Sequence, residues 1–172
     1  MRSVIRLVRA DASLLDAALQ GDDALGRALG VGVVPGWVSF TEALPPTRDA
    51  VAADPGRVEW SSRFFVAGDP PELVGWDGFK GPPQAGVVEL GYEIAERRQG
   101  RGLGTAATRA MVEEAFADDR VTAVIAHTLA ERNASNRVLE KAGFTFDGET
   151  QEDGETVWRW RLARVDAEAN RP

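Results

Sequence analysis

The chain has 172 residues, no cysteine and a single histidine, His127. This length suits one domain with one core, large enough to fold without a disulfide or a metal. The absence of cysteine excludes thiol catalysis and a disulfide framework, and a lone histidine argues against a metal site. The net charge of −7 argues against nucleic acid or an anionic membrane as a partner and favours a cationic one.

The hydropathy pattern predicts a cytoplasmic protein. Apolar runs stay well below the roughly 20 residues that a membrane-spanning helix needs. The opening segment MRSVIRLVRADAS alternates charged and apolar residues, and it lacks the apolar stretch and cleavage site of a signal peptide.

The first third of the chain predicts a strand followed by two helices. Asp11 or Ser13 can cap the first helix, because short polar side chains accept hydrogen bonds from the unpaired N–H groups there. Repeated glycine and proline then predict an irregular segment. In chain order we expect a strand over 4–9, helices over 14–19 and 22–29, and irregular structure over 30–60 with a short helix from Pro46 to Ala53.

The middle of the chain predicts an antiparallel meander. Two apolar runs flank the turn Gly68-Asp69-Pro70-Pro71 and form a hairpin. A second turn leads into a third strand that continues to Ile94. The predicted strands cover 63–67, 73–76 and 87–94, with the second turn over 80–86.

From Leu103 the apolar spacing changes to that of a helix, which ends near Asp118. The β-branched run Val121–Ala126 is typical of a strand buried on both faces beside a parallel neighbour. We therefore expect a βαβ unit over 87–128. After it we expect a helix over 133–142 ended by a glycine, a hairpin of strands 144–149 and 156–162 around the turn 152–154, and a frayed tail after Arg164.

A glycine-rich segment, Gln99-Gly100-Arg101-Gly102-Leu103-Gly104-Thr105, lies between a predicted strand and the start of a predicted helix. Unpaired N–H groups and the positive end of the helix dipole make such a place an anion site, which predicts a ligand that carries phosphate. A plain glycine turn on an arginine-rich surface is the alternative. The segment lacks the Gly-Lys-Ser/Thr ending of a P-loop, and its match to a dinucleotide motif is weak because Thr122 stands where an acidic residue is needed.

These residues resemble the GCN5-related N-acetyltransferases. Gln99 to Gly104 fits that family's Q/R-x-x-G-x-G/A pyrophosphate loop. A second block, Asn133-Ala134-Ser135-Asn136 to Glu140-Lys141-Ala142-Gly143-Phe144, resembles the N-x-x-S…E-K-x-G-F helix of the branch that includes the ribosomal-protein N-terminal acetyltransferases. The strand Glu89 to Ile94 also resembles that branch, so the likeness covers about 87 to 149.

The resemblance implies a single α/β (α+β) domain over 1–172. It has a mixed, mostly antiparallel sheet, a central βαβ unit and flanking helices. It also implies acetyl-CoA as the cofactor that donates the acetyl group, without a metal, and a homodimer as a frequent assembly. The cofactor-binding positions carried over are Ile94, Glu96, Gln99, Gly100, Arg101, Gly102, Leu103, Gly104, Thr105 and Asn133.

Acetyl transfer to an amine needs an acceptor for the amine proton and a donor for the departing thiolate. Glu89 and Glu93 share a face of the predicted strand, and Glu89 matches better the family position of a general base. Many relatives have a tyrosine four residues before Gly143, but Leu139 stands there and the sole tyrosine is Tyr92. The branch instead points to Ser135 as the second catalytic residue, unless this serine only caps its helix.

The sequence thus predicts an acetyl-CoA-dependent N-acetyltransferase that acts on a primary amine, either of a small molecule or of a protein N-terminus. A non-catalytic acyl-CoA-binding or sensor domain is the alternative. We leave His127 outside the catalytic set, because a lone histidine is more often an ordinary polar group with a partner.

Overall fold

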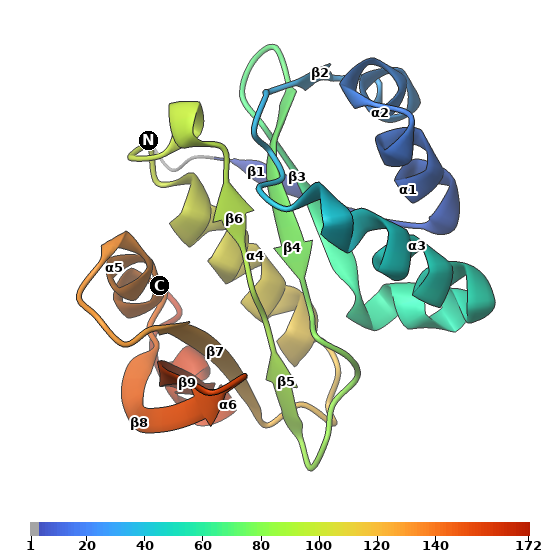
Figure 1. Ribbon diagram of the computed structural model, residues 1–172. Helices are drawn as coiled ribbons and strands as arrows, with labels where there is room; N and C mark the ends of the chain where they lie inside the picture. Colours follow the sequence, from blue (N-terminus) through green and yellow to red (C-terminus); the bar gives the residue numbers. More distant parts are fainter. Residues whose placement is uncertain (1–3) are drawn as a thin grey trace.

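Two β-sheets, joined by a short bridge between Phe79 and Leu90, organise the molecule (Figure 1). A computed structural model describes residues 4–172, so the first three residues of the predicted domain lie outside the described part. The first sheet has the order β1–β3–β4–β2, and β6 also pairs with β4; the second has the order β5–β7–β9–β8. The strands are β1 (Ile5–Arg9), β2 (Gly32–Val33), β3 (Ser62–Ala67), β4 (Glu72–Gly78), β5 (Val87–Glu89), β6 (Glu93–Ile94), β7 (Ala123–Leu129), β8 (Thr145–Glu152) and β9 (Glu155–Ala163).

Helices cover the sheets in two layers, each over its own apolar cluster. The longest helix packs across one cluster, in which its Met111 is buried together with Phe65 and Val124 from the strands. Three helices of the first third cover the other cluster, where Trp37 and Trp76 are buried. The helices are α1 (Ala12–Leu19), α2 (Asp22–Leu29), α3 (Leu44–Ala53), α4 (Leu103–Phe116), α5 (Ala134–Lys141) and α6 (Arg164–Ala169), with short 3₁₀ turns at Thr41–Ala43, Pro55–Trp60 and Glu96–Arg98.

The predicted single strand over 87–94 is wrong, because the chain changes sheets within it. β5 runs parallel to β7, whereas β6 pairs only with β4. Leu90 is the junction: it bridges Phe79 on one side, and its N–H donates to the carbonyl of Ile125 on the other, at 3.0 Å. Beyond Leu90 the two sheets part, and this separation positions the site described below.

Most other predicted elements are present. Asp11 caps α1, accepting a hydrogen bond from the Leu14 N–H at 2.9 Å. The β3–β4 hairpin, the parallel β5–α4–β7 unit and the antiparallel β8–β9 hairpin all form. The mixed, mostly antiparallel α/β architecture with flanking helices agrees with the prediction.

Two segments differ from their prediction. The stretch predicted to be irregular also contains β2, and the short helix predicted from Pro46 to Ala53 forms as α3 but begins earlier, at Leu44. Both prolines lie in its first turn, where a missing N–H breaks no helical hydrogen bond. The tail after Arg164 forms α6, because the Arg164 guanidinium donates to the carbonyls of Phe116, Asp118 and Val121 at 2.7–3.0 Å. Over the described residues, the structure contains no helix of the length and apolarity that crossing a bilayer requires.

Candidate active site

A cleft of about 460 Å³ opens where β6 separates from β7. Its walls come from β6, from the glycine-rich segment with the first turn of α4, and from the first two turns of α5. Within the described chain, β7 has no strand partner beside Ala126–Leu129 on this side, so its backbone edge faces the separation. The cleft is lined by Ser39, Tyr92, Glu93, Ile94, Arg98, Gln99, Gly100, Gly102, Leu103, Gly104, Thr105, Ala134, Ser135, Arg137, Val138 and Lys141.

The start of α4 gives the cleft an anion-binding wall. Its N-cap is Gly102, in the left-handed conformation with φ of 77°, and among the described residues no side chain caps the helix. Gly100 also has a positive φ, of 73°. The N–H groups of the first turn are therefore available to an anionic ligand at the positive end of the helix dipole.

The arginines beside this wall differ in role. Arg98 forms a two-pronged ion pair with Glu72 of β4, at 2.9 to 3.2 Å, which ties the segment to the first sheet. Gln99 fixes the same segment by donating to the Ile94 carbonyl at 3.0 Å. Arg101 is exposed and lines a neighbouring hollow together with Thr105.

Most of the predicted cofactor-binding residues lie together in the cleft. Three lie outside its lining, namely Glu96, Arg101 and Asn133. Asn133 is the N-cap of α5, and its side-chain oxygen accepts from the Asn136 N–H and from the Asn136 amide group, at 3.2 and 3.1 Å. The cap of α5 is therefore Asn133 and not Ser135, which lines the cleft from the first turn of the helix.

Tyr92 crosses the separation between the sheets. Its hydroxyl donates to the Ser135 carbonyl at 3.1 Å, and its ring lines the cleft near Gly104. Burial raises the pKa of Tyr92 to about 12. The sequence shows that Tyr92 is the sole tyrosine, but its place in a predicted strand does not indicate that its side chain reaches α5.

Glu93 marks the other end of the cleft. Its carboxylate accepts from the Trp76 indole N–H at 2.7 Å and from the Ser39 N–H at 2.9 Å. The loop before α3 is thereby held against β6. Of the two glutamates considered from the sequence, Glu93 is the one that lines the cleft.

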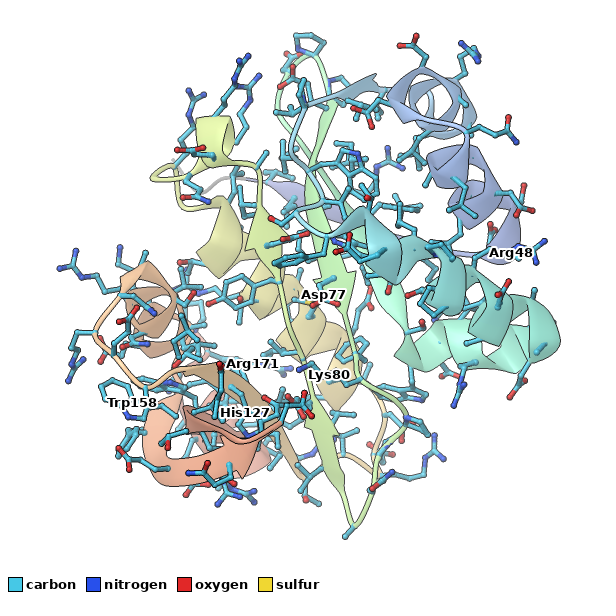
Figure 2. All side chains as sticks on the ribbon, viewed as in Figure 1. Arg48, Asp77, Lys80, His127, Trp158 and Arg171 are labelled. Carbon is cyan, nitrogen blue, oxygen red and sulfur yellow. The ribbon has the colours of Figure 1, made fainter. Side chains whose placement is uncertain are left out.

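Glu89, the predicted general base, lies on β5 with two partners. One of its oxygens lies 2.8 Å from Nδ1 of His127 and 3.0 Å from the Lys80 ammonium. Burial alone would raise the pKa of Glu89, but the hydrogen bonds from His127 and Lys80 outweigh burial and lower it. In Figure 2, Lys80 lies beside β5 and His127 across from it on β7.

Asp77 is an acidic residue next to Gly91 that sequence reasoning missed, and it lies just outside the cleft lining. It lies on β4 beside the junction, near Lys80 in Figure 2, and its φ of 134° is in the left-handed range. Burial raises its pKa to about 6; the Lys80 charge acts against this shift, and the Glu93 and Glu89 charges add to it. The sequence shows only a single Asp in an apolar strand, and this pattern does not predict the burial or the neighbouring charges of Asp77.

One group of side chains has the spacing of a metal site. Glu89, His127 and Glu152 offer ligand atoms that all lie within 4.8 Å of one another. The Lys80 ammonium already pairs with Glu89 there and would repel a cation. The prediction that the reaction uses no metal keeps its physical basis.

Comparisons with known proteins agree on one family. A family model described as an acetyltransferase (GNAT) domain matches residues 2–145. The chain is also 28% identical over 151 residues to the uncharacterized N-acetyltransferase YjdG of Bacillus subtilis (strain 168), a match that covers 86% of this chain and 90% of that protein.

Solved structures share the fold along the whole chain. The aminoglycoside acetyltransferase AAC(6')-Ib, in complex with ribostamycin and coenzyme A, has a TM-score of 0.67 at 19% identity, covering 100% of this chain and 99% of that one. The Microcin C7 self immunity acetyltransferase MccE, in complex with acetyl-CoA and AMP, has a TM-score of 0.66 at 15% identity, covering 92% of each chain. Identities this low establish the fold and leave the acceptor open.

Proposed function

This chain belongs to the acetyltransferase (GNAT) family, and from that premise we propose that it transfers the acetyl group of acetyl-CoA directly to a primary amine. The observation that carries the proposal is the cleft between the parted sheets. One wall is the uncapped start of α4, which suits a pyrophosphate, and the opposite end is the carboxylate of Glu93, which suits an ammonium group.

The donor half of the cleft supports the proposed cofactor contacts. The glycines at 100, 102 and 104 let the backbone approach the pyrophosphate, and Thr105 lies in the first turn of α4. The open edge of β7 and the backbone of Ile94 offer groups that can pair with the amides of the pantetheine arm, as an added strand would. Glu96, Arg101 and Asn133 stay as predicted contacts at the margin of this path.

The two predicted catalytic roles also stay as proposals. Glu89 would accept the amine proton, and the Ser135 hydroxyl would donate a hydrogen bond to the departing sulfur. The position of Ser135 in the cleft lining supports its role. Glu89 is already paired with the Lys80 ammonium and hydrogen-bonded to His127, which weakens it as a base.

The acceptor is proposed to be a cationic amine, because the carboxylate of Glu93 lies at the far end of the cleft and the whole chain carries a net charge of −7. A protein N-terminus, as the resemblance to the ribosomal-protein branch implies, is one candidate. An aminoglycoside, named for a structural relative, is another. The cytoplasmic location and the homodimer stay predictions beside them.

The test is a panel of amines that contains N-terminal peptides, aminoglycosides and polyamines, with release of the CoA thiol as the readout. We expect at least one amine to give acetylated product, checked by mass, together with CoA. Tight binding of acetyl-CoA with no turnover on any amine would favour the alternative, a non-catalytic acyl-CoA-binding domain.

A further inference from the structure

We infer that Asp77 is the catalytic residue that takes the proton from the amine, directly or through one water. This inference rests on the proposed acetyl transfer and assigns to Asp77 a step for which the sequence pattern had favoured Glu89. It is carried by the position of Asp77 at the junction of the two sheets, by its backbone and by its surroundings.

The molecule makes room for the Asp77 carboxylate at the junction. Gly91 directly follows Leu90 and immediately precedes Tyr92, which lines the cleft. A side chain at Gly91 would place its Cβ 2.6 Å from an oxygen of Asp77, well inside contact distance. The carboxylate thus occupies the space where a strand residue would normally project; it lies outside the cleft lining, against the residue that precedes Tyr92.

The backbone of Asp77 is held in a conformation that side chains rarely adopt. Its φ of 134° departs from the ordinary strand geometry of its neighbour Trp76 in β4. Such strain persists only where the surroundings enforce it, and it is concentrated at functional sites. Here the Gly91 N–H donates to the Gly78 carbonyl at 2.9 Å and the Lys80 N–H donates to the Glu89 carbonyl at 2.9 Å, which hold the chain on both sides of Asp77.

Of the three neighbouring carboxylates, Asp77 is the one least occupied by hydrogen-bond and ion-pair partners, so it is the most available to accept a proton. Glu89 of β5 is paired with Lys80 and His127, and Glu93 of β6 accepts from Trp76 and Ser39. Within the described chain, Asp77 forms no ion pair within 4 Å, and the Gly78 backbone N–H acts against the rise of its pKa. The negative charges of Glu89 and Glu93 raise its proton affinity, and Lys80 lowers it.

The step balances without another reactant. Asp77 accepts one proton from the substrate ammonium, and the freed lone pair forms the N–C bond to the thioester carbonyl. The C–S bond then breaks, its electrons leave with the sulfur, and a proton makes the CoA thiol. That proton is the second one lost by the nitrogen, and Asp77 releases the first to water, so the net products are the acetamide, the thiol and one proton.

The decisive experiment measures kcat/KM against pH for the best amine of the panel, in the wild type and in Asp77→Asn. We expect the wild type to lose activity below about pH 6, and we expect Asp77→Asn to lose that limb and to fall about 10²- to 10⁴-fold in kcat. The KM for acetyl-CoA should stay the same. Asp153→Asn is the matched control, because Asp153 also has a positive φ but is exposed in the β8–β9 turn.

A second variant guards against a misfolded Asp77→Asn. Gly91→Ala keeps Asp77 but forces its carboxylate aside. We expect it to lower kcat while acetyl-CoA still raises the melting temperature. The inference is overturned if Asp77→Asn and Gly91→Ala both keep the wild-type pH profile, or if Glu89→Gln alone removes the acid limb. A wild type that releases no CoA with any amine would instead reject the proposed function.

Discussion

At the scale of single residues, the site concentrates negative charge where a cationic amine would enter. Asp77, Glu89 and Glu93 come from three different strands, and only Glu89 has a cationic partner in contact. Three carboxylates placed close together lower the stability of the fold, because like charges repel and burial disfavours the ionised form. Function and stability are therefore expected to oppose each other at Asp77.

Replacing Asp77 with Asn should stabilise the fold near neutral pH. The folded pKa of about 6 lies above the value near 4 expected for an unfolded Asp. The contribution of Asp77 to the free energy of unfolding therefore falls as the pH rises from about 4 to about 6, and above about pH 6 it stays at this lower value. Asn, which tolerates positive φ, should add on the order of 1–3 kcal/mol at pH 7.5 and nothing near pH 3.5. Denaturant unfolding at both pH values checks this; a lower stability at pH 7.5 would contradict it.

Replacing Ser135 with Ala should slow turnover and leave stability nearly unchanged. A hydroxyl that bonds the departing sulfur matters most as negative charge develops there, so we expect about a 10- to 100-fold loss in single-turnover rate. Asn133→Ala is the contrasting variant: as the true cap of α5 it should cost about 1 kcal/mol of folding stability. An unchanged rate in Ser135→Ala would remove this serine from the mechanism. Tyr92→Phe then tests the neighbouring hydroxyl.

At the scale of elements, what the sequence could predict depended on whether the signal was local. The Asp11 cap, the glycine turns and the apolar spacing of α4 are local, and these elements form as predicted. The change of sheet at Leu90 depends on two distant partners, Phe79 and Ile125, so an apolar run looked like one strand. The reach of Tyr92 to α5 and the raised pKa of Asp77 are long-range for the same reason.

The glycine-rich segment was the part of the candidate site most visible in the sequence, and it yields a prediction for the start of α4. Binding of acetyl-CoA should stabilise the folded protein by about 2.7 kcal/mol at one hundred times its dissociation constant and so raise the melting temperature. Gly102→Val should abolish this rise. A β-branched side chain is strained at a φ of 77° and would lie in the path of the pyrophosphate. Gly154→Val, at a φ of 82° in the β8–β9 turn, controls for strain alone. A folded Gly102→Val that keeps the full shift would reject the loop assignment.

At the scale of the whole molecule, two sheets that part beyond one junction must be held together elsewhere. α4 spans both sheets on one face, and Arg164, which directly follows β9, ties the far end of α4 to the loop that leads into β7. That guanidinium donates to three backbone carbonyls and lies 5.0 Å from the centre of the Phe116 ring. The cleft can therefore open at one end of β7 because the other end is fixed.

Arg164→Ala should accordingly weaken the whole fold while sparing the cleft chemistry. It leaves carbonyls at the end of α4 and the start of β7 without their charged donor, a loss of about 2–4 kcal/mol of unfolding free energy. Arg27→Ala, on the exposed face of α2, should stay within about 0.5 kcal/mol. Because Arg164 lies outside the cleft lining, the acetyl-CoA dissociation constant measured well below the melting temperature should match that of the wild type. Unfolding curves and acetyl-CoA titrations on the same samples separate the two effects. If the acetyl-CoA dissociation constant rises while the unfolding free energy stays normal, the fixed end of β7 sets the width of the cleft and not only the stability of the fold.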